Sequence, residues 1–273
     1  GFPWFLRLVS SIIWRLSYSS QDGTLGDMRI VGIDCAVAPE KTGIVVARWE
    51  GGALRVEQSA AGSERRPPEE IVLEAMEPNT LIALDAPLGW PESFGTNLAE
   101  HLAGEPLPVQ ARTFFRRETD EFVAKRLGKR PMDVAADRIG RTAFSALEII
   151  RRVREAGWAP GSLAWSPEEA REGVHTIESY PAGRLAATGL PARGYKRREQ
   201  RPARERILAA LAEELEIVSP LEPFLDDADQ LDALLCAAGA ADFLRGSCIA
   251  PHNPQRARKE GWIWVREPLC GTS

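Results

Sequence analysis

A run of strand patterns between residues 29 and 85 constrains the fold more than any other feature of the sequence. Apolar or alternating segments predict four strands there, at 29–36, 42–50, 53–59 and 80–85. Gly51-Gly52 separates the second and third segments and is typical of a two-residue hairpin turn. A short helix is predicted at 69–76, before the fourth strand. This order indicates an α/β protein with a mixed sheet flanked by helices.

The middle of the sequence is different, because from about residue 89 to 166 charged helical segments stand between prolines. We predict helices at 119–127 and 134–156, and we interpret residues 90–170 as a helical insertion that forms a cap over the sheet. The later predictions are a fifth strand at 174–180, helices at 203–215 and 226–244, and a closing strand or edge segment at 261–265. Residues 28–265 are thus predicted to form one domain, followed by a C-terminal tail at 266–273.

Residues 1–27 differ from this domain in composition. They are rich in apolar and aromatic residues, but Arg7 and Arg15 make the segment too polar for a membrane span. The segment also lacks the basic start and small-residue cleavage site of a secretory signal. It is a non-native segment ahead of a native start at Met28, an ordered extension that packs on the domain, or an interfacial amphipathic helix. We favour the first interpretation, because a strand pattern begins directly after Met28.

The overall composition is that of a globular protein, with 44% hydrophobic and 27% charged residues. A net charge of −5 argues against a wholly basic nucleic-acid-binding protein, although it is compatible with local basic patches. The cysteines form no CxxC pair, and isolated cysteines in apolar stretches are typical of buried free thiols in a reducing compartment. They are Cys35, Cys236, Cys248 and Cys270. We therefore expect a cytoplasmic protein without a membrane segment.

Two aspartates occur where the strand patterns are most apolar. Asp34 lies late in the first predicted strand, and Asp85 ends the fourth. A buried carboxylate costs several kcal/mol unless it is paired, hydrogen-bonded or bound to metal. Ligand sites of open α/β sheets lie at the carboxyl ends of strands, where Asp85 falls. Each residue is thus a candidate metal ligand, the alternative being a hydrogen-bonded turn residue.

The predicted helix 226–244 carries two further aspartates in its first turns. Asp229 and Asp232 are three residues apart, so they share one face, and small residues continue that face. The helix is apolar nearly all round and should be buried. Its two carboxylates then need compensation, either by metal or by arginine. Asp226 and Asp227 can act as N-terminal caps instead.

Four motifs in this order resemble the family called domain of unknown function 429, whose members are predicted nucleases of the ribonuclease H-like superfamily. They are Gly32-Ile33-Asp34-Cys35-Ala36, Asp85-Ala86-Pro87, Glu178-Ser179-Tyr180-Pro181 and Asp229-Gln230-Leu231-Asp232-Ala233. The last motif is also similar to the final helix of Holliday-junction resolvases of that superfamily. The strand order from 29 to 85 resembles the first half of a ribonuclease H-like sheet.

The resemblance implies hydrolysis of DNA or RNA phosphodiester bonds by two Mg²⁺ or Mn²⁺ ions, roughly 3.5–4 Å apart. Asp34 would bridge both ions and Asp85 would hold one. Asp229 and Asp232 would complete the second site, with Glu178 as a further ligand or a base. The resolvases have a glutamate where this chain has Asp85, so the shorter side chain alters the metal geometry expected there.

Basic residues cluster at 112–130 and at 193–206, where they would contact backbone phosphates or form a solvated face. In the first cluster, Arg112, Arg116 and Asp120 share a face if the stretch is helical, and they would point at the substrate. Lys196 belongs to the second cluster, for which we favour phosphate contact. Trp90 follows the Asp85 motif and would stack on a base or pack a loop.

Two other functions remain open. Actin-like and sugar-kinase-like ATP-using enzymes share this core, but they need Gly/Thr-rich phosphate loops after the first strand. Here the first strand is followed by a segment that is poor in such residues. A binding protein that kept the fold and lost activity is the other alternative, since a fold does not fix a function. The sequence does not indicate an oligomeric state.

Overall fold

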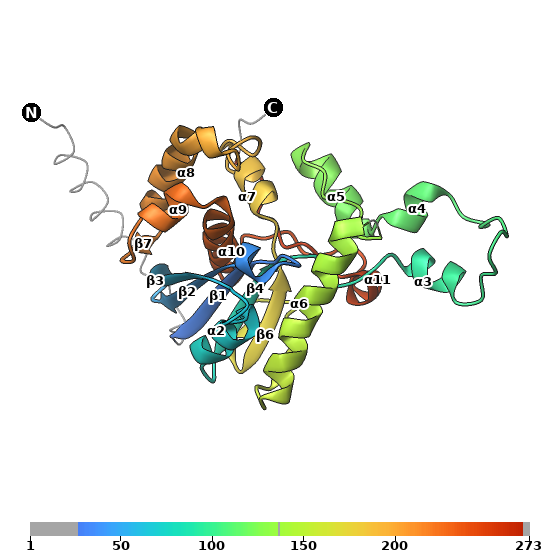
Figure 1. Cartoon of the computed structure of the whole chain (residues 1–273), viewed down its shortest axis with the longest axis horizontal. Helices are drawn as coiled ribbons and strands as arrows, with labels where there is room; N and C mark the ends of the chain where they lie inside the picture. Colours follow the sequence, from blue (N-terminus) through green and yellow to red (C-terminus); the bar gives the residue numbers. More distant parts are fainter. Residues whose placement is uncertain (1–26, 136, 270–273) are drawn as a thin grey trace, which may run out of the picture.

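The computed structural model describes residues 27–135 and 137–269. Its centre is one mixed sheet of seven strands (Figure 1). The strands are β1 (Met28–Asp34), β2 (Gly43–Glu50), β3 (Ala53–Ala61), β4 (Thr80–Asp85), β5 (Pro160–Leu163), β6 (Val174–Glu178) and β7 (Glu216–Ile217). The predictions for β2, β3 and β4 are confirmed to within two residues. The first strand ends at Asp34, two residues earlier than predicted.

The strands are arranged in the order β5-β6-β4-β1-β2-β3-β7. β2 is antiparallel to both of its neighbours, β1 and β3, whereas the other pairs are parallel. The β2–β3 hairpin turns at Gly51 and Gly52, whose φ angles of 56° and 84° favour glycine, as the sequence predicted. β1 therefore stands in the middle of the sheet, parallel to β4 and antiparallel to β2.

Helices cover both faces of the sheet. They are α2 (Pro68–Ala75), α3 (Glu92–Leu98), α4 (Ala111–Phe115), α5 (Glu118–Leu127), α6 (Asp137–Glu155), α7 (Pro181–Ala187), α8 (Arg201–Glu214), α9 (Glu222–Asp226), α10 (Ala228–Leu244) and α11 (Pro254–Glu260). In Figure 1, α10 lies on one face with α8 and α9, while α2 and α6 lie on the other. Each face of the sheet thus has its own hydrophobic core.

Side chains of β1 alternate between these two cores. Ile30 packs in the core that contains the leucines of α10, whereas Val31 and Ile33 pack in the core that contains residues of α2 and α6. Because successive side chains of a strand point to opposite faces, Gly32 and Asp34 lie on the α10 side. The same alternation in β4 puts Asp85 on the α10 side.

One strand was missed, because β5 lies inside the region where no strand was predicted. The predicted strand 174–180 is confirmed as β6, which ends at Glu178, before Pro181. Pro181 itself stands at the first turn of α7, a helix that was not predicted, where its missing N–H costs nothing. The predicted helix 226–244 is confirmed as α10, which begins two residues later because Asp227 is extended and its side chain caps the helix by accepting a hydrogen bond from Asp229 N.

The helical insertion is helical as expected, from α3 to α6, but α6 forms part of the layer on the α2 face. The apolar residues Ala146, Ile149, Ile150 and Val153 of α6 are buried in that core. The closing segment 261–265 is an edge segment, in which Ile263 forms a single parallel bridge with Glu178. Trp262 and Trp264 are buried in the other core.

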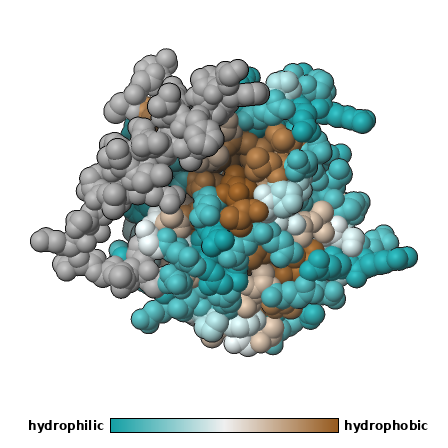
Figure 2. Space-filling view, turned by 90° about the vertical axis from the view of Figure 1, so that its left-hand side faces the viewer, coloured by the Kyte–Doolittle hydropathy of each residue, from teal (hydrophilic) through white to brown (hydrophobic). Residues whose placement is uncertain are grey.

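The surface in Figure 2 belongs to the side of the molecule where β3, β7, α8 and α9 lie. It shows apolar side chains gathered within a mostly polar surface. Val218 and Leu221, which follow β7, are among the exposed large apolar side chains of the described residues.

Within residues 27–135 and 137–269, no helix combines the length and the apolar character needed to cross a bilayer. The prediction for residues 1–27 falls almost entirely outside the described residues.

Candidate functional site

Asp34 and Asp85 are brought together by the sheet itself. They are the last residues of β1 and β4, which are adjacent and parallel, and they are paired directly in register. Both lie on the α10 face. Asp34 is four residues after Ile30 and Asp85 is two residues after Ala83, and Ile30 and Ala83 both pack in the core on that face. The carboxyl ends of adjacent parallel strands therefore present two carboxylates side by side, as expected for the ligand site of an open α/β sheet.

Helix α10 adds a third carboxylate because it packs directly on β1. A Cβ placed on Gly32 would lie 2.3 Å from the Ala233 carbonyl oxygen, so only glycine allows this approach. Gly43 of β2 has the same role, since a Cβ there would lie 2.2 Å from the Asp229 carbonyl oxygen. The close packing places Asp232, which is fully buried, over the ends of β1 and β4.

Asp34, Asp85 and Asp232 form a group that we call the acidic centre. Each offers a carboxylate oxygen, and these oxygens all lie within 4.8 Å of one another. Such a group of hard oxygen donors can hold a metal ion and suits Mg²⁺, Mn²⁺ or Ca²⁺ rather than a soft metal. Three of the four predicted metal ligands are thus adjacent. Asp229, one turn earlier in α10, is only half-buried and lies outside this group.

Burial makes the negative charge of the acidic centre costly. It raises the pKa of Asp34 well above its ordinary value, with a further contribution from the neighbouring Asp232. It also raises the pKa of Asp85, to about 7, and raises that of Asp232. Carboxylates respond in this way when desolvation and like charges outweigh the nearby positive charge. The acidic centre therefore favours an added cation.

A lysine already contacts the acidic centre. The Lys196 ammonium forms an ion pair with Asp232 Oδ2 and lies 3.9 Å from Asp34 Oδ2. The neighbouring Tyr195 hydroxyl donates a 2.7 Å hydrogen bond to Asp232 Oδ1. Sequence reasoning placed Lys196 among phosphate-binding residues and missed Tyr195. A lone lysine within an arginine-rich segment was the available signal.

Glu178 lies near the acidic centre without joining it. It is paired in register with Leu84, whose side chain packs in the α2 and α6 core, so Glu178 faces away from α10. The buried Arg117 guanidinium binds both of its carboxylate oxygens, at 2.7 and 2.8 Å, and Leu88 N donates to it at 3.1 Å. Sequence reasoning missed Arg117, which follows α4 and stands 61 residues before its partner.

Arg117 also binds Asp120, a predicted substrate-contacting residue. Its guanidinium donates to the Asp120 carboxylate at 2.8 and 3.2 Å, and Asp120 is only 2% exposed. Asp120 Oδ2 accepts a further bond from Arg117 N. We call Arg117, Asp120 and Glu178 the Arg117 cluster. It ties α5 to the end of β6.

Arg112 and Arg116 do not share a helical face with Asp120, contrary to the prediction. Arg112 lies in α4, Arg116 is extended, and Asp120 lies in α5. The Arg112 side chain is exposed and paired with Glu121, while Arg116 pairs with Glu121 at 3.0 Å and Asp133 at 3.2 Å. The helix breaks at Arg116, so the spacing of four does not bring these residues onto one side.

Trp90 follows β4 and lines a shallow hollow in front of α3, together with Leu88 and Phe94. The Glu92–Lys259 ion pair lies across this hollow. Trp90 is partly buried. It stands three residues beyond the Asp85-Ala86-Pro87 motif, on the chain segment that leaves the acidic centre.

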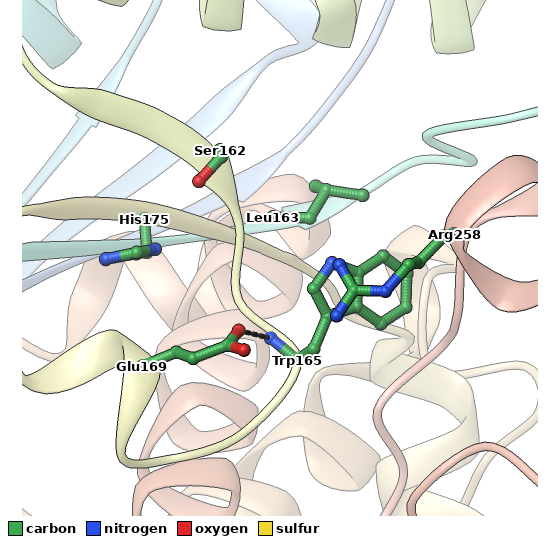
Figure 3. Close-up of a pocket in the computed structure, with 6 residues that line it drawn as sticks. All are labelled: Ser162, Leu163, Trp165, Glu169, His175 and Arg258. Atoms are coloured by element: carbon green, nitrogen blue, oxygen red, sulfur yellow. Dashed lines mark hydrogen bonds between the residues drawn. The ribbon is translucent and has the colours of Figure 1, made fainter. Parts of the chain in front are cut away.

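A second hollow lies at the β5 edge of the sheet and does not include any residue of the acidic centre (Figure 3). Trp165 lies under the Arg258 guanidinium, whose carbon is 5.1 Å from the ring centroid, and Glu169 accepts a hydrogen bond from Trp165 N. His175 Nε2 lies 3.0 Å from the Glu172 carbonyl oxygen.

No curated protein matches this chain. The acidic centre falls within the part of the chain that a family model matches. That model covers residues 32–256, and the chain therefore belongs, as its motifs indicated, to the family described as Protein of unknown function (DUF429).

Proposed function

We propose that this protein hydrolyses phosphodiester bonds of nucleic acid with divalent metal bound at the acidic centre. The observation that carries the proposal is the convergence of Asp34, Asp85 and Asp232 at one edge of the sheet, with carboxylate oxygens within 4.8 Å of one another. Buried carboxylates without matching positive charge are costly, and they are typical of metal and catalytic sites.

The strand arrangement supports a ribonuclease H-like sheet. β1, β2 and β3 form an antiparallel meander, β1 is followed in space by the parallel strands β4 and β6, and acids end β1 and β4. The similarity of the sequence motifs to ribonuclease H-like proteins implies this strand order, with aspartates at the ends of β1 and β4. A fold can host several activities, so the acidic centre rather than the sheet carries the function.

Asp34 and Asp85 would hold the metal, with Asp232 completing the acidic centre beside them. A bound divalent ion supplies Lewis-acid stabilisation of phosphate charge and a water of lowered pKa. The carboxylates keep such an ion at the strand ends, and β1, β4 and α10 keep the carboxylates in place. Carboxylate oxygens favour Mg²⁺ or Mn²⁺, the ions expected from the sequence.

Basic side chains near the acidic centre support a polyanionic substrate. Burial lowers the pKa of Lys129, which follows α5, and the charges of Arg193 and Lys196 lower it further. Two segments far apart in the sequence, 129 and 193–196, therefore bring positive charge to the same region. Arg193 and Arg197 are exposed and free to contact phosphate.

The test is cleavage of a panel of single-stranded, duplex and branched DNA and RNA with Mg²⁺ or Mn²⁺. We expect cleavage by the wild type, and a loss of at least a hundredfold in the Asp34→Asn variant. Asp226→Asn removes an exposed carboxylate that pairs with Arg201 at the end of α9, so it is the matched control and should keep full activity. Equal inertness of all three proteins on every substrate would leave the proposal without support.

A further inference from the structure

The three carboxylates of the acidic centre are not equivalent. Asp232 has both oxygens engaged, one by the Tyr195 hydroxyl at 2.7 Å and the other by the Lys196 ammonium. None of the hydrogen bonds among the described residues reaches the carboxylates of Asp34 and Asp85, whose nearest positive charge is Lys196, 3.9 Å from Asp34 Oδ2. The one ammonium is thus bound to Asp232, and it reaches Asp34 and Asp85 only from a greater distance.

Lys196 is held at the acidic centre by its backbone. The buried Arg204 guanidinium donates to the carbonyl oxygens on both sides of Lys196, those of Tyr195 at 2.6 Å and Arg197 at 2.9 Å. Arg204 also donates to the Leu225 carbonyl oxygen at 2.6 Å, which fixes the segment to α9. The Tyr195 ring is itself buried, at 2% exposed. The segment that carries Lys196 is therefore built into the fold.

A charge count follows from this arrangement. Asp34, Asp85 and Asp232 carry three negative charges when ionised, and Lys196 carries one positive charge. The remainder is two negative charges, which one divalent ion neutralises. Asp229 is left out of this count because its carboxylate lies outside the acidic centre, and the charges of Lys196 and Lys41 both act on it.

We infer that the acidic centre binds one divalent metal ion, held by Asp34 and Asp85, and that Lys196 is a built-in second cation on the Asp232 side. This inference rests on the metal site of the proposed function and replaces the two-ion arrangement expected from the sequence. An ammonium fixed beside a metal-bound phosphate would stabilise phosphate charge without requiring a second ion.

Lys196 is also a residue whose removal should leave the fold intact. Its side chain is 51% exposed, and its ammonium reaches the acids. Lys196→Met keeps the length of the apolar chain and removes the charge. Lys125→Met is the matched control, since Lys125 lies on the exposed surface of α5.

The first measurement is Mn²⁺ binding to the full chain by isothermal titration and by electron paramagnetic resonance of free Mn²⁺. We expect one Mn²⁺ per chain for the wild type and Lys125→Met, and two for Lys196→Met, whose Asp232 is released for a second ion. Two ions on the wild type, or an unchanged single ion on Lys196→Met, would overturn the inference and leave the proposed function standing. No binding to the wild type would overturn both.

The second measurement is a crystal structure with Mn²⁺ and anomalous scattering. One anomalous peak between Asp34 and Asp85, with the Lys196 ammonium still on Asp232, is the expected result. Two peaks with Lys196 displaced from Asp232 would show that the lysine competes with metal, which contradicts the inference while supporting a metal-dependent enzyme. Absence of a peak at Asp34 would remove the metal site on which both proposals depend.

Discussion

The acidic centre and the Arg117 cluster are two groups of buried charges at the same edge of the sheet, and they are built on opposite principles. In the Arg117 cluster, both carboxylates accept two guanidinium hydrogen bonds and one further bond from a backbone N–H. In the acidic centre, three carboxylates share one ammonium and one tyrosine hydroxyl. One group is saturated with donors, whereas the other is not.

This difference separates a structural role from a functional one. A buried ion pair whose hydrogen bonds are complete holds elements in place and has little capacity left for a ligand. A buried group of carboxylates with few donors is unstable by itself and gains from a cation. Substitutions in the two groups should therefore change the stability of the fold with opposite signs.

The largest effect should come from Arg117→Met. This change leaves Glu178 and Asp120 buried without their donor, and breaking a buried pair in this way costs about 3–5 kcal/mol. We expect the urea midpoint of unfolding to fall by a large fraction of its wild-type value. If the variant is too unstable to purify, Arg117→Lys, which keeps the charge and loses the bidentate contacts, should show an intermediate loss.

Arg112→Met is the control for this prediction. Arg112 also pairs with a glutamate, Glu121, but its side chain is exposed, so solvent replaces the lost contact and little change in the midpoint is expected. A wild-type midpoint for Arg117→Met would show that the Arg117 cluster does not stabilise the fold.

Asp85→Asn should have the opposite sign. Burial raises the pKa of Asp85 to about 7 in the folded protein, above the value of about 3.9 in an unfolded chain. The folded state thus prefers the protonated carboxyl. Its stabilisation is complete below pH 3.9 and is lost as the pH rises through about 7. With a chelator present, Asp85→Asn should therefore gain up to about 4 kcal/mol over the wild type at pH 8 and almost nothing at pH 4.

Glu77→Gln is the control for this sign. Hydrogen bonding to Arg48 lowers the pKa of Glu77, so its contribution is present at neutral pH and is lost on acidification. This variant should lose stability at pH 8 and approach the wild type near pH 2. Urea unfolding at several pH values measures both variants. A pH-independent difference between Asp85→Asn and the wild type would contradict the buried, poorly compensated carboxylate.

The fold was predictable where a local pattern determines it. β2, β3 and β4 follow from alternation and from Gly51-Gly52, and Asp34 and Asp85 were placed correctly because they end apolar strands. β5 (Pro160–Leu163) was missed because it is short and contains a proline and a glycine, so its sequence has no strand pattern. It is a strand only because it pairs with β6. α7 was missed because proline both ends strands and begins helices.

The site was predictable only in part, because register and long-range pairing leave no local pattern. Glu178 ends an apolar strand as Asp34 and Asp85 do, yet its register with Leu84 turns it to the other face. Its partner Arg117 is 61 residues away in the sequence. Likewise, the clamp on Tyr195 and Lys196 by Arg204 is visible only once α8 is packed. The nuclease assignment itself stays a prediction.

The smallest of these effects should come from Tyr195→Phe, which removes one of the two groups that compensate Asp232. The lost hydrogen bond to a buried carboxylate should cost about 1–2 kcal/mol at pH 8. Tyr180→Phe is the matched control, because the Tyr180 hydroxyl donates only to the Arg130 carbonyl oxygen, in a neutral and partly exposed bond. A double-mutant cycle with Asp232→Asn assigns the effect, since Tyr195→Phe should cost much less stability once residue 232 is uncharged.

Two results would contradict this prediction: equal losses of stability in the two tyrosine variants, or no coupling between residues 195 and 232. Either would show that Asp232 does not depend on Tyr195 and that Lys196 alone compensates the acidic centre.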